Sequence, residues 1–432
     1  MTDNALTVPM TTVTEDGLKI TKTFYFERGK HSIDVNFEVE NSSPNSLEVQ
    51  PFYQLKQQIA GEEASMMMPT YRGAVFSTND EAYEKYDFDD MLDANLNKAT
   101  VGGYVGMIQH YFVSAWVPAQ DKQNAIYSRV TGNNAFAIVG VKSPAEIVNA
   151  GETLNLKSTL FAGPKNQAEL DAIHKNLGLT VDYGFLWFIS ILLFDLLVMI
   201  NDVVGNWGIA IILITIVVKT LLYPLTKKQY TSMAKMRALQ PKMEQLKSRF
   251  GDDRQKMGQA MMELYKKEKV NPLAGCLPIL IQIPVFFSLY KVLFVTIEMR
   301  HAPFFGWIQD LSAPDPTTIF NLFGLIPWTP PSFLMLGVWP ILMGFPMFVQ
   351  MKMNPAPADP MQQKIFAWMP LIFTFVLAGF PAGLVIYWAW NNFLSVLQQG
   401  YIMRRHGVKI ELWDNLRKMI TREKSAAESS KS

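Results

Sequence analysis

Short runs of alternating apolar and polar residues fill the first 165 residues of the chain. The clearest run is "HSIDVNFEVEN", residues 31–41, whose four apolar residues all fall on one side of an extended chain. Alternation with a period of two is typical of a half-buried β-strand. Further strand-like runs, separated by turn-forming residues, cover 47–55, 111–117, 136–141 and 154–163. The pattern predicts an antiparallel β-sandwich domain over residues 1–165.

The pattern becomes helical after residue 165. "NQAELDAIHKNLG", residues 166–178, predicts a helix that Gly178 ends. "GFLWFISILLFDLLVMIND", residues 184–202, is apolar but carries Asp195, which favours a helix lying in the membrane interface over one that crosses the membrane. We therefore predict a linker helix and an interfacial amphipathic helix over residues 166–204.

Long apolar stretches dominate residues 205–403. Five of them are long enough to cross a bilayer, namely 206–225, 273–297, 332–351, 364–380 and 382–403. Three of them, 273–297, 332–351 and 364–380, contain prolines well inside the stretch. Proline interrupts the helical hydrogen bonds and is tolerated in lipid where neighbouring helices or water satisfy the freed groups. The pattern predicts an all-α polytopic membrane domain with five core transmembrane helices around an irregular or hydrated interior.

The distribution of charge sets the expected orientation of these spans. Residues 1–184 hold 14 Lys/Arg against 23 Asp/Glu, net −9, whereas residues 185–432 hold 25 against 15, net +10. The basic residues gather in the loop 226–270 and in the tail 404–432, which the positive-inside rule places in the cytoplasm. We predict a multi-pass membrane protein with its N-terminal domain on the outer side of the membrane and its C-terminus in the cytoplasm. Since no export signal precedes the β domain, we expect the native chain to begin further upstream.

The loop 226–270 carries apolar residues at alternating spacings of three and four, which predicts a cytoplasmic coiled-coil hairpin. We expect few contacts between this hairpin and the spans. Its methionines either fill the hairpin's own core or form a surface that captures varied apolar segments, because the thioether side chain repacks easily. The candidate capture surface consists of Met233, Met236, Met243, Met257 and Met261.

Lys219 stands inside the first predicted span, where a charge is costly. Its side chain either extends to the cytoplasmic headgroups or faces the bundle interior. The second alternative is favoured by Thr215 and Tyr223, which lie four residues to either side and share its helical face. Other spans offer polar partners for a shared cavity open to the cytoplasm, namely Gln282, Tyr290, Gln350, Trp388 and Asn391.

Nothing in the sequence predicts catalysis. Cys276 is the only cysteine, so an intrachain disulfide and a cysteine metal cluster are excluded. His31, His110 and His174 are scattered without metal-ligand spacing, and neither an HExxH motif nor a P-loop occurs. We predict no catalytic residues, no metal, no cofactor and no enzymatic activity.

Several longer segments resemble the YidC membrane-protein insertase family of Gram-negative bacteria. They include "YPLTKKQYTSMAKMRALQPKMEQLKSRFGDD", "LYKKEKVNPLAGCLPILIQIPVFFSLY", "APFFGWIQDLSAPDP" and "FPAGLVIYWAWNN" in the helical part, and "KTFYFERG" and "YEKYDFDD" in the β domain. The resemblance covers nearly the whole chain and implies that the family's first transmembrane segment is absent from it. Lys219 occupies the position at which better-known members carry arginine, so a mechanism that requires bidentate pairing there is disfavoured.

The resemblance implies an insertase and chaperone that inserts and helps fold nascent inner-membrane proteins through a hydrophilic intramembrane groove. It also implies a multi-pass protein of the bacterial inner membrane, with its β-sandwich as a periplasmic domain. It implies as partners the nascent clients, the Sec translocon, the lipid bilayer, and the ribosome and signal recognition particle machinery through the hairpin and basic tail. No sequence-specific nucleic-acid binding is expected. Two alternatives stay open: a secondary transporter or channel with Lys219 as an ion or substrate site, and a membrane-anchored carbohydrate enzyme.

Overall fold

The computed structural model describes residues 4–59, 70–250, 253–268, 277–328, 330–331, 335–354 and 360–407. The predicted cytoplasmic tail beyond residue 407, Cys276 and short parts of the predicted spans 273–297 and 332–351 lie outside these residues. The chain divides into two compact units, Met1–Asp182 with Val295–Ile297 (the β unit) and Tyr183–Phe294 with Glu298–Ser432 (the helical unit). Each unit is described by itself.

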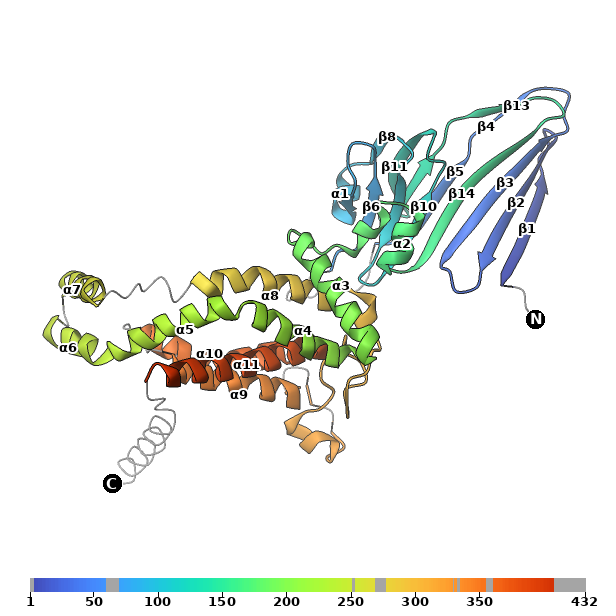
Figure 1. Cartoon of the computed structure of the whole chain (residues 1–432). Helices are drawn as coiled ribbons and strands as arrows, with labels where there is room; N and C mark the ends of the chain where they lie inside the picture. Colours follow the sequence, from blue (N-terminus) through green and yellow to red (C-terminus); the bar gives the residue numbers. More distant parts are fainter. Residues whose placement is uncertain are drawn as a thin grey trace. The chain divides into compact units, whose positions relative to one another are not determined.

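Antiparallel strands form the β unit (Figure 1). They are β1 (Ala5–Val13), β2 (Leu18–Glu27), β3 (Ser32–Asn41), β4 (Leu47–Val49), β5 (Phe52–Gln58), β6 (Gly73–Ser77), β7 (Glu84–Asp87), β8 (Asn97–Val101), β9 (Tyr104–Ile108), β10 (Phe112–Val117), β11 (Gln123–Thr131), β12 (Phe136–Lys142), β13 (Glu146–Val148) and β14 (Thr153–Pro164). One sheet has the order β1-β2-β3-β14-β10-β9-β6-β7, a second β5-β12-β11-β8, and β13 pairs with β4.

Apolar side chains from the two larger sheets make the core, and this confirms the predicted β-sandwich. Val35 of β3, Phe76 of β6 and Ile126 of β11 each expose 1% of their surface and belong to one cluster. The alternation seen in residues 31–41 recurs in β3, where Val35 and Val39 are buried and Asp34 is exposed. The period of two therefore reports correctly which side of the strand faces the core.

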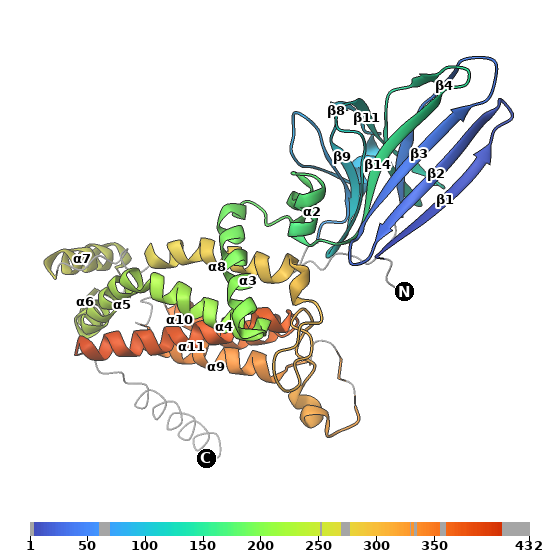
Figure 2. The same ribbon diagram turned by 45° about the vertical axis from the view of Figure 1, so that its right-hand side comes forward.

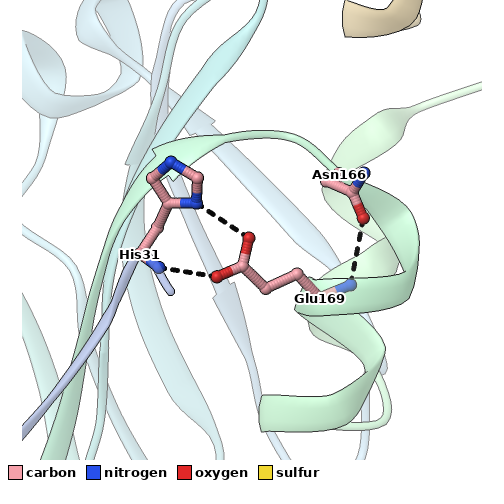
Figure 3. Close-up of polar contacts among 3 residues, drawn as sticks. All are labelled: His31, Asn166 and Glu169. Atoms are coloured by element: carbon pink, nitrogen blue, oxygen red, sulfur yellow. Dashed lines mark hydrogen bonds and ion pairs between the residues drawn. The ribbon is translucent and has the colours of Figure 1, made fainter. Parts of the chain in front are cut away.

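Two helices and a 3₁₀ turn complete the β unit: α1 (Phe88–Asp93), α2 (Gln167–Ile173) and η1 (Leu177–Val181). Asn166 caps α2 by accepting a hydrogen bond from the backbone N–H of Glu169, and the Glu169 carboxylate accepts bonds of 2.7 and 2.9 Å from the backbone N and Nδ1 of His31 (Figure 3). These bonds tie α2 to the start of β3.

The structure corrects the expected end of the linker helix and of the domain. The helix ends at Ile173 rather than at Gly178, because His174 adopts an extended conformation. Leu170 and Leu177 are completely buried, and the side chain of Asn176 donates to Ser77 on β6. Residues 166–182 are thus part of the β unit, which ends at Asp182 rather than at residue 165.

The helical unit contains nine α-helices among its described residues (Figure 2). They are α3 (Trp187–Val204), α4 (Trp207–Leu221), α5 (Tyr223–Ala238), α6 (Gln240–Phe250), α7 (Arg254–Lys267), α8 (Leu277–Val295), α9 (Val338–Met353), α10 (Pro360–Leu377) and α11 (Ala382–Arg405). Short 3₁₀ turns are η3 (Ile297–Met299), at the boundary of the units, and η4 (Ile319–Gly324). Both views show α9, α10 and α11 side by side, with α4 along α11.

The predicted spans correspond to α4, α8, α9, α10 and α11, and prolines lie inside α8, α9 and α10 as expected. By length and composition alone, α3 is the single helix among the described residues that passes as a membrane span, and the bent pair α4–α5 passes if it is counted as one. The helix predicted to lie in the interface therefore has the length and apolarity of a span. Its crossing or interfacial position stays a prediction, as does the number of spans.

A sharp bend separates α4 from α5 and corrects the first predicted span, 206–225. The two helices meet at Leu222 at an angle of 68°. Pro224 lacks the N–H that would continue the hydrogen bonds of α4, whereas it is well accommodated in the first turn of a new helix. The polar stripe that includes Thr215, Lys219 and Tyr223 is consequently split after Lys219.

The hairpin is confirmed in α6 and α7, but it is shorter than the predicted 226–270. α6 and α7 pack together, with the Tyr265 hydroxyl 3.7 Å from the Met243 sulfur and an ion pair between Lys242 and Glu268. α5 instead packs against α9 and α11, where Ala234 is buried with Met353 and Met403. The expectation of few contacts to the spans is thus wrong for α5, because the apolar seam continues into α5 but meets different partners there.

Candidate functional site

The Lys219 side chain faces the interior of the helical unit. It lies near the end of α4, exposes 8% of its surface, and its Nζ donates a 2.7 Å hydrogen bond to the Ser395 Oγ on α11. The Ser395 hydroxyl in turn donates to the backbone carbonyl of Asn391, 2.8 Å away. The lysine is therefore an interhelical contact and does not extend outward to the headgroups.

Further polar groups surround this contact. Thr215, one turn before Lys219, exposes 2% and donates its hydroxyl proton to the Ile211 carbonyl at 2.6 Å. On α5, the buried Tyr230 interacts through its hydroxyl with the side chains of Ser395 and Gln350. We call Thr215, Lys219, Tyr230, Gln350 and Ser395, with the Asn391 carbonyl, the Lys219 cluster; it draws on α4, α5, α9 and α11.

The positive charge of Lys219 is only partly satisfied by the described residues around it. An ammonium group has three N–H donors, and among the described residues Ser395 is its one hydrogen-bond partner. No aspartate or glutamate of those residues pairs with it. A buried charge without a counter-ion is costly. Two donors thus remain for water or for an incoming anionic or polar group.

Two members of the cluster, Ser395 and Tyr230, were missed by the sequence analysis. A signal for Ser395 was present, because Tyr387, Asn391, Ser395 and Gln399 follow one another at intervals of four along one face of α11. Gln399 is completely buried and donates to the Asn354 side chain at 3.0 Å. Extending the polar pattern of α11 beyond Asn391 would have identified the contact.

Four of the predicted site residues lie outside the cluster. Tyr223 is half-buried beyond the bend at Leu222. On α8, Tyr290 stacks on Phe294 with ring centroids 5.7 Å apart, and Gln282 is half-buried. Trp388 stacks on Phe286 at 5.8 Å, and its buried indole N–H has no hydrogen-bond partner among the described residues. Trp388 and Phe286 thus make an aromatic contact between α11 and α8.

The five methionines of the predicted capture surface are all half-buried. Met233 and Met236 belong to α5, Met243 to α6, and Met257 and Met261 to α7, so the set is divided between a helix that packs on the spans and the hairpin proper. At the open end of the hairpin, a hydrogen bond from Lys242 holds the pKa of Glu268 below its usual value, so Glu268 stays ionised.

The described residues of the β unit offer no comparable site. Burial, with a smaller contribution from Lys175, lowers the pKa of His174, whose ring packs against Tyr104 at 5.4 Å. His31 is engaged with Glu169. Within the described residues, no group of His, Cys, Asp or Glu side chains has the arrangement that holds a metal ion.

Comparison with known proteins identifies both halves of the chain. Residues 1–196 match the family model "YidC periplasmic domain", and residues 199–409 match "60Kd inner membrane protein". The membrane protein insertase YidC of Shewanella woodyi is 52% identical over 94% of this chain and 72% of its own length, and that of Shewanella pealeana is 52% identical over 94% and 71%.

A solved structure of an active YidC insertase with its first transmembrane domain resolved covers 90% of this chain and 93% of its own, at 18% identity and a TM-score of 0.40. Identity above one half over almost the whole chain is sufficient to assign the family, which is named for insertion of membrane proteins and not for a catalysed reaction. This chain, with its periplasmic β-sandwich and its helical unit, belongs to the YidC family of inner-membrane protein insertases.

Proposed function

We propose that this protein inserts nascent inner-membrane proteins by receiving the short polar end of a client beside Lys219. The observation that carries the proposal is a buried ammonium group with two donors unsatisfied by the described residues. A carboxylate on the translocated end of a client is the chemical group that would best satisfy them. The apolar part of the client then leaves sideways into lipid along α8 and α10.

Two forces drive this step without ATP. Transfer of an apolar segment from water to lipid is favourable in proportion to the area removed from water. The membrane potential acts on the acidic end of the client and contributes about 2.3 kcal/mol per charge per 100 mV. The Lys219 cluster lowers the cost of bringing polar groups partway into the membrane, while the client's own sequence and the potential supply the direction.

The proposed topology follows from the charge distribution. The β unit lies in the periplasm, α4, α8, α9, α10 and α11 cross the membrane, and α6, α7 and the basic tail lie in the cytoplasm. The hairpin collects the nascent chain and contacts the ribosome or the signal recognition particle machinery, and the spans pass clients on alone or together with the Sec translocon. A hydrophilic groove at Lys219, open to the cytoplasm, is part of this proposal.

A transporter or channel would need more than this cluster. Such proteins place several ionisable groups at membrane depth. In the described part of the helices of the helical unit, Lys219 is the one charged residue whose side chain is buried. A hydrated single charge fits transient contact with many different clients better than selective binding of one solute.

Ser395 provides the first test of the proposal. We expect Ser395→Ala to slow insertion of a single-span client with an acidic translocated end roughly three- to tenfold, because loss of a hydrogen bond that positions a charge costs about 1 kcal/mol or more. The measurement is protease protection of the translocated end in membrane vesicles whose only insertase is the variant chain.

Two matched controls accompany this test. Ser395→Thr keeps the hydroxyl and should insert the client at the parent rate. Thr220→Ala removes the hydroxyl of the residue next to Lys219. Thr220 is exposed, and its hydroxyl donates to the Ile216 carbonyl of the same helix. Equal insertion by Ser395→Ala and Thr220→Ala would remove Ser395 from the mechanism.

A further inference from the structure

A buried carboxylate outside the Lys219 cluster collects four hydrogen-bond donors. Asp315, in the segment between α8 and α9, exposes 3% of its surface. Its Oδ1 accepts bonds from the Trp307 indole N–H (3.1 Å) and from the backbone N–H and hydroxyl of Thr317 (3.0 and 2.7 Å). Its Oδ2 accepts a 2.9 Å bond from the backbone N–H of Trp339, in the first turn of α9.

These bonds make Asp315 and Thr317 a cap for α9 that comes from a distant part of the chain. The residue before the helix, Gly337, makes no side-chain cap of its own. The Thr317 hydroxyl oxygen accepts a 3.1 Å bond from the N–H of Val338, while Asp315 takes that of Trp339. A negative group at a helix N-terminus is also favoured by the helix dipole.

The cap leaves no room for a side chain at Gly337. A Cβ atom there would lie 2.6 Å from the Asp315 Cγ and 2.7 Å from its Oδ2. Glycine is therefore required by the close approach of the carboxylate. A single added methyl group would displace Asp315 without altering any charge.

The same segment accepts hydrogen bonds from residues at the N-terminal ends of two more helices. At α11, the N–H groups of Ala382 and Gly383 donate to the carbonyls of Ala313 (2.7 Å) and Leu311 (2.9 Å). At α4, the Asn206 amide donates to the carbonyls of Pro303 and Phe304, both at 3.3 Å, while its oxygen caps the N–H of Ile209.

Packing reinforces these hydrogen bonds. The Phe304 ring lies 5.8 Å from that of Trp339 on α9, and it occupies the space beside Gly208 on α4, where an added Cβ would lie 2.1 Å from the ring. Ile308 and Leu311 each expose 1%. One segment thus contacts the N-terminal ends of α4, α9 and α11.

We infer that Asp315 is the positioning residue of a shared cap, residues 302–317, whose hydrogen bonds hold the N-terminal ends of α4, α9 and α11 together and so keep water from passing between them. Lys219 lies 13 residues along α4 from Asn206, roughly 20 Å away at 1.5 Å per residue. The inference rests on the proposed function, in which water reaches Lys219 from one side only.

A thiol-labelling experiment in the full chain tests the cap without requiring insertion. With Cys276 replaced by Ser, a cysteine is introduced by Ile211→Cys, a position that is completely buried in the first half of α4. A membrane-impermeant maleimide is added from the periplasmic side. We expect slow labelling in this parent and labelling at least tenfold faster after Asp315→Asn and after Gly337→Ala. In either orientation, the asparagine sets its amide N–H₂ against an N–H donor, that of Trp339 or those of Trp307 and Thr317.

Matched variants separate the cap from a general loss of structure. Gly379→Ala makes the same change where an added Cβ meets nothing within 4 Å, and it should label at the parent rate. Thr317→Val removes the hydroxyl and should accelerate labelling, whereas Thr317→Ser keeps it and should not. Parent-rate labelling of Asp315→Asn, Gly337→Ala and Thr317→Val, at normal membrane levels, would overturn the inference. A failure of the insertase proposal would appear instead as insertion that does not depend on Lys219, which this labelling does not measure.

Discussion

Replacing Lys219 with glutamate should reduce insertion of a client with an acidic translocated end by more than tenfold, and alanine should reduce it by about tenfold. Two unit charges 4 Å apart interact by about 4 kcal/mol at an effective dielectric constant of 20, so reversing the charge turns a substantial attraction into repulsion. Lys219→Arg should retain insertion, because positive charge and hydration are kept. Insertion is measured by protease protection of the translocated end.

The client supplies the internal control for this prediction. When the acidic residues of its translocated end are changed to the corresponding amides, the difference between Lys219 and Lys219→Ala should shrink to less than threefold, because no carboxylate remains to meet the ammonium group. Equal insertion of the acidic client by the Ala, Glu and Arg variants would exclude an electrostatic role of Lys219.

Deletion of the hairpin has the second large expected effect. Replacing residues 240–268, which span α6 and α7, with a short Gly/Ser linker should abolish insertion while the spans remain folded, because the contacts of α6 and α7 are mainly with each other. Folding is measured by membrane level and resistance to protease, and insertion by the same protection assay.

A larger deletion provides the contrast. Extending it back to residue 230 removes Tyr230 and Ala234, which pack against α9 and α11, and should lower the membrane level of the protein as well. A variant lacking only 240–268 that is stable and fully active would remove the hairpin from the mechanism. Loss of folding in that variant would contradict the division between α5 and the hairpin.

The β-sandwich was predictable because the order of apolar and polar residues within each strand shows which side chains are buried. In β3, alternation at single-residue spacing is produced by one sheet face, and no information about distant segments is needed. The end of the β unit was not predictable in the same way. Residues 166–182 are held there by single buried side chains such as Leu170 and Leu177, and a short irregular segment has no period that reveals its partner.

In the helical unit, the sequence identified Lys219 but not its partner or the bend beside it. A proline at position 224 fits both a kinked span and the first turn of a new helix, and only packing decides between them. The apolar seam that runs from Met236 into α6 likewise predicts that its residues are buried. It does not indicate which helix they pack against. The shared cap at Asp315 depends on residues far apart in the chain and leaves no local pattern.

A photocrosslinking measurement tests most directly whether clients contact the Lys219 cluster. A photoreactive residue is placed at Asn391 or Gln350, which are half-buried and belong to the cluster, or at Phe393, which exposes 41% on α11. With a ribosome-stalled single-span client, we predict crosslinks from positions 391 and 350 to its acidic translocated end, and few from position 393. Crosslinking of that end from position 393 alone, or from none of the three positions while insertion proceeds, would contradict the account.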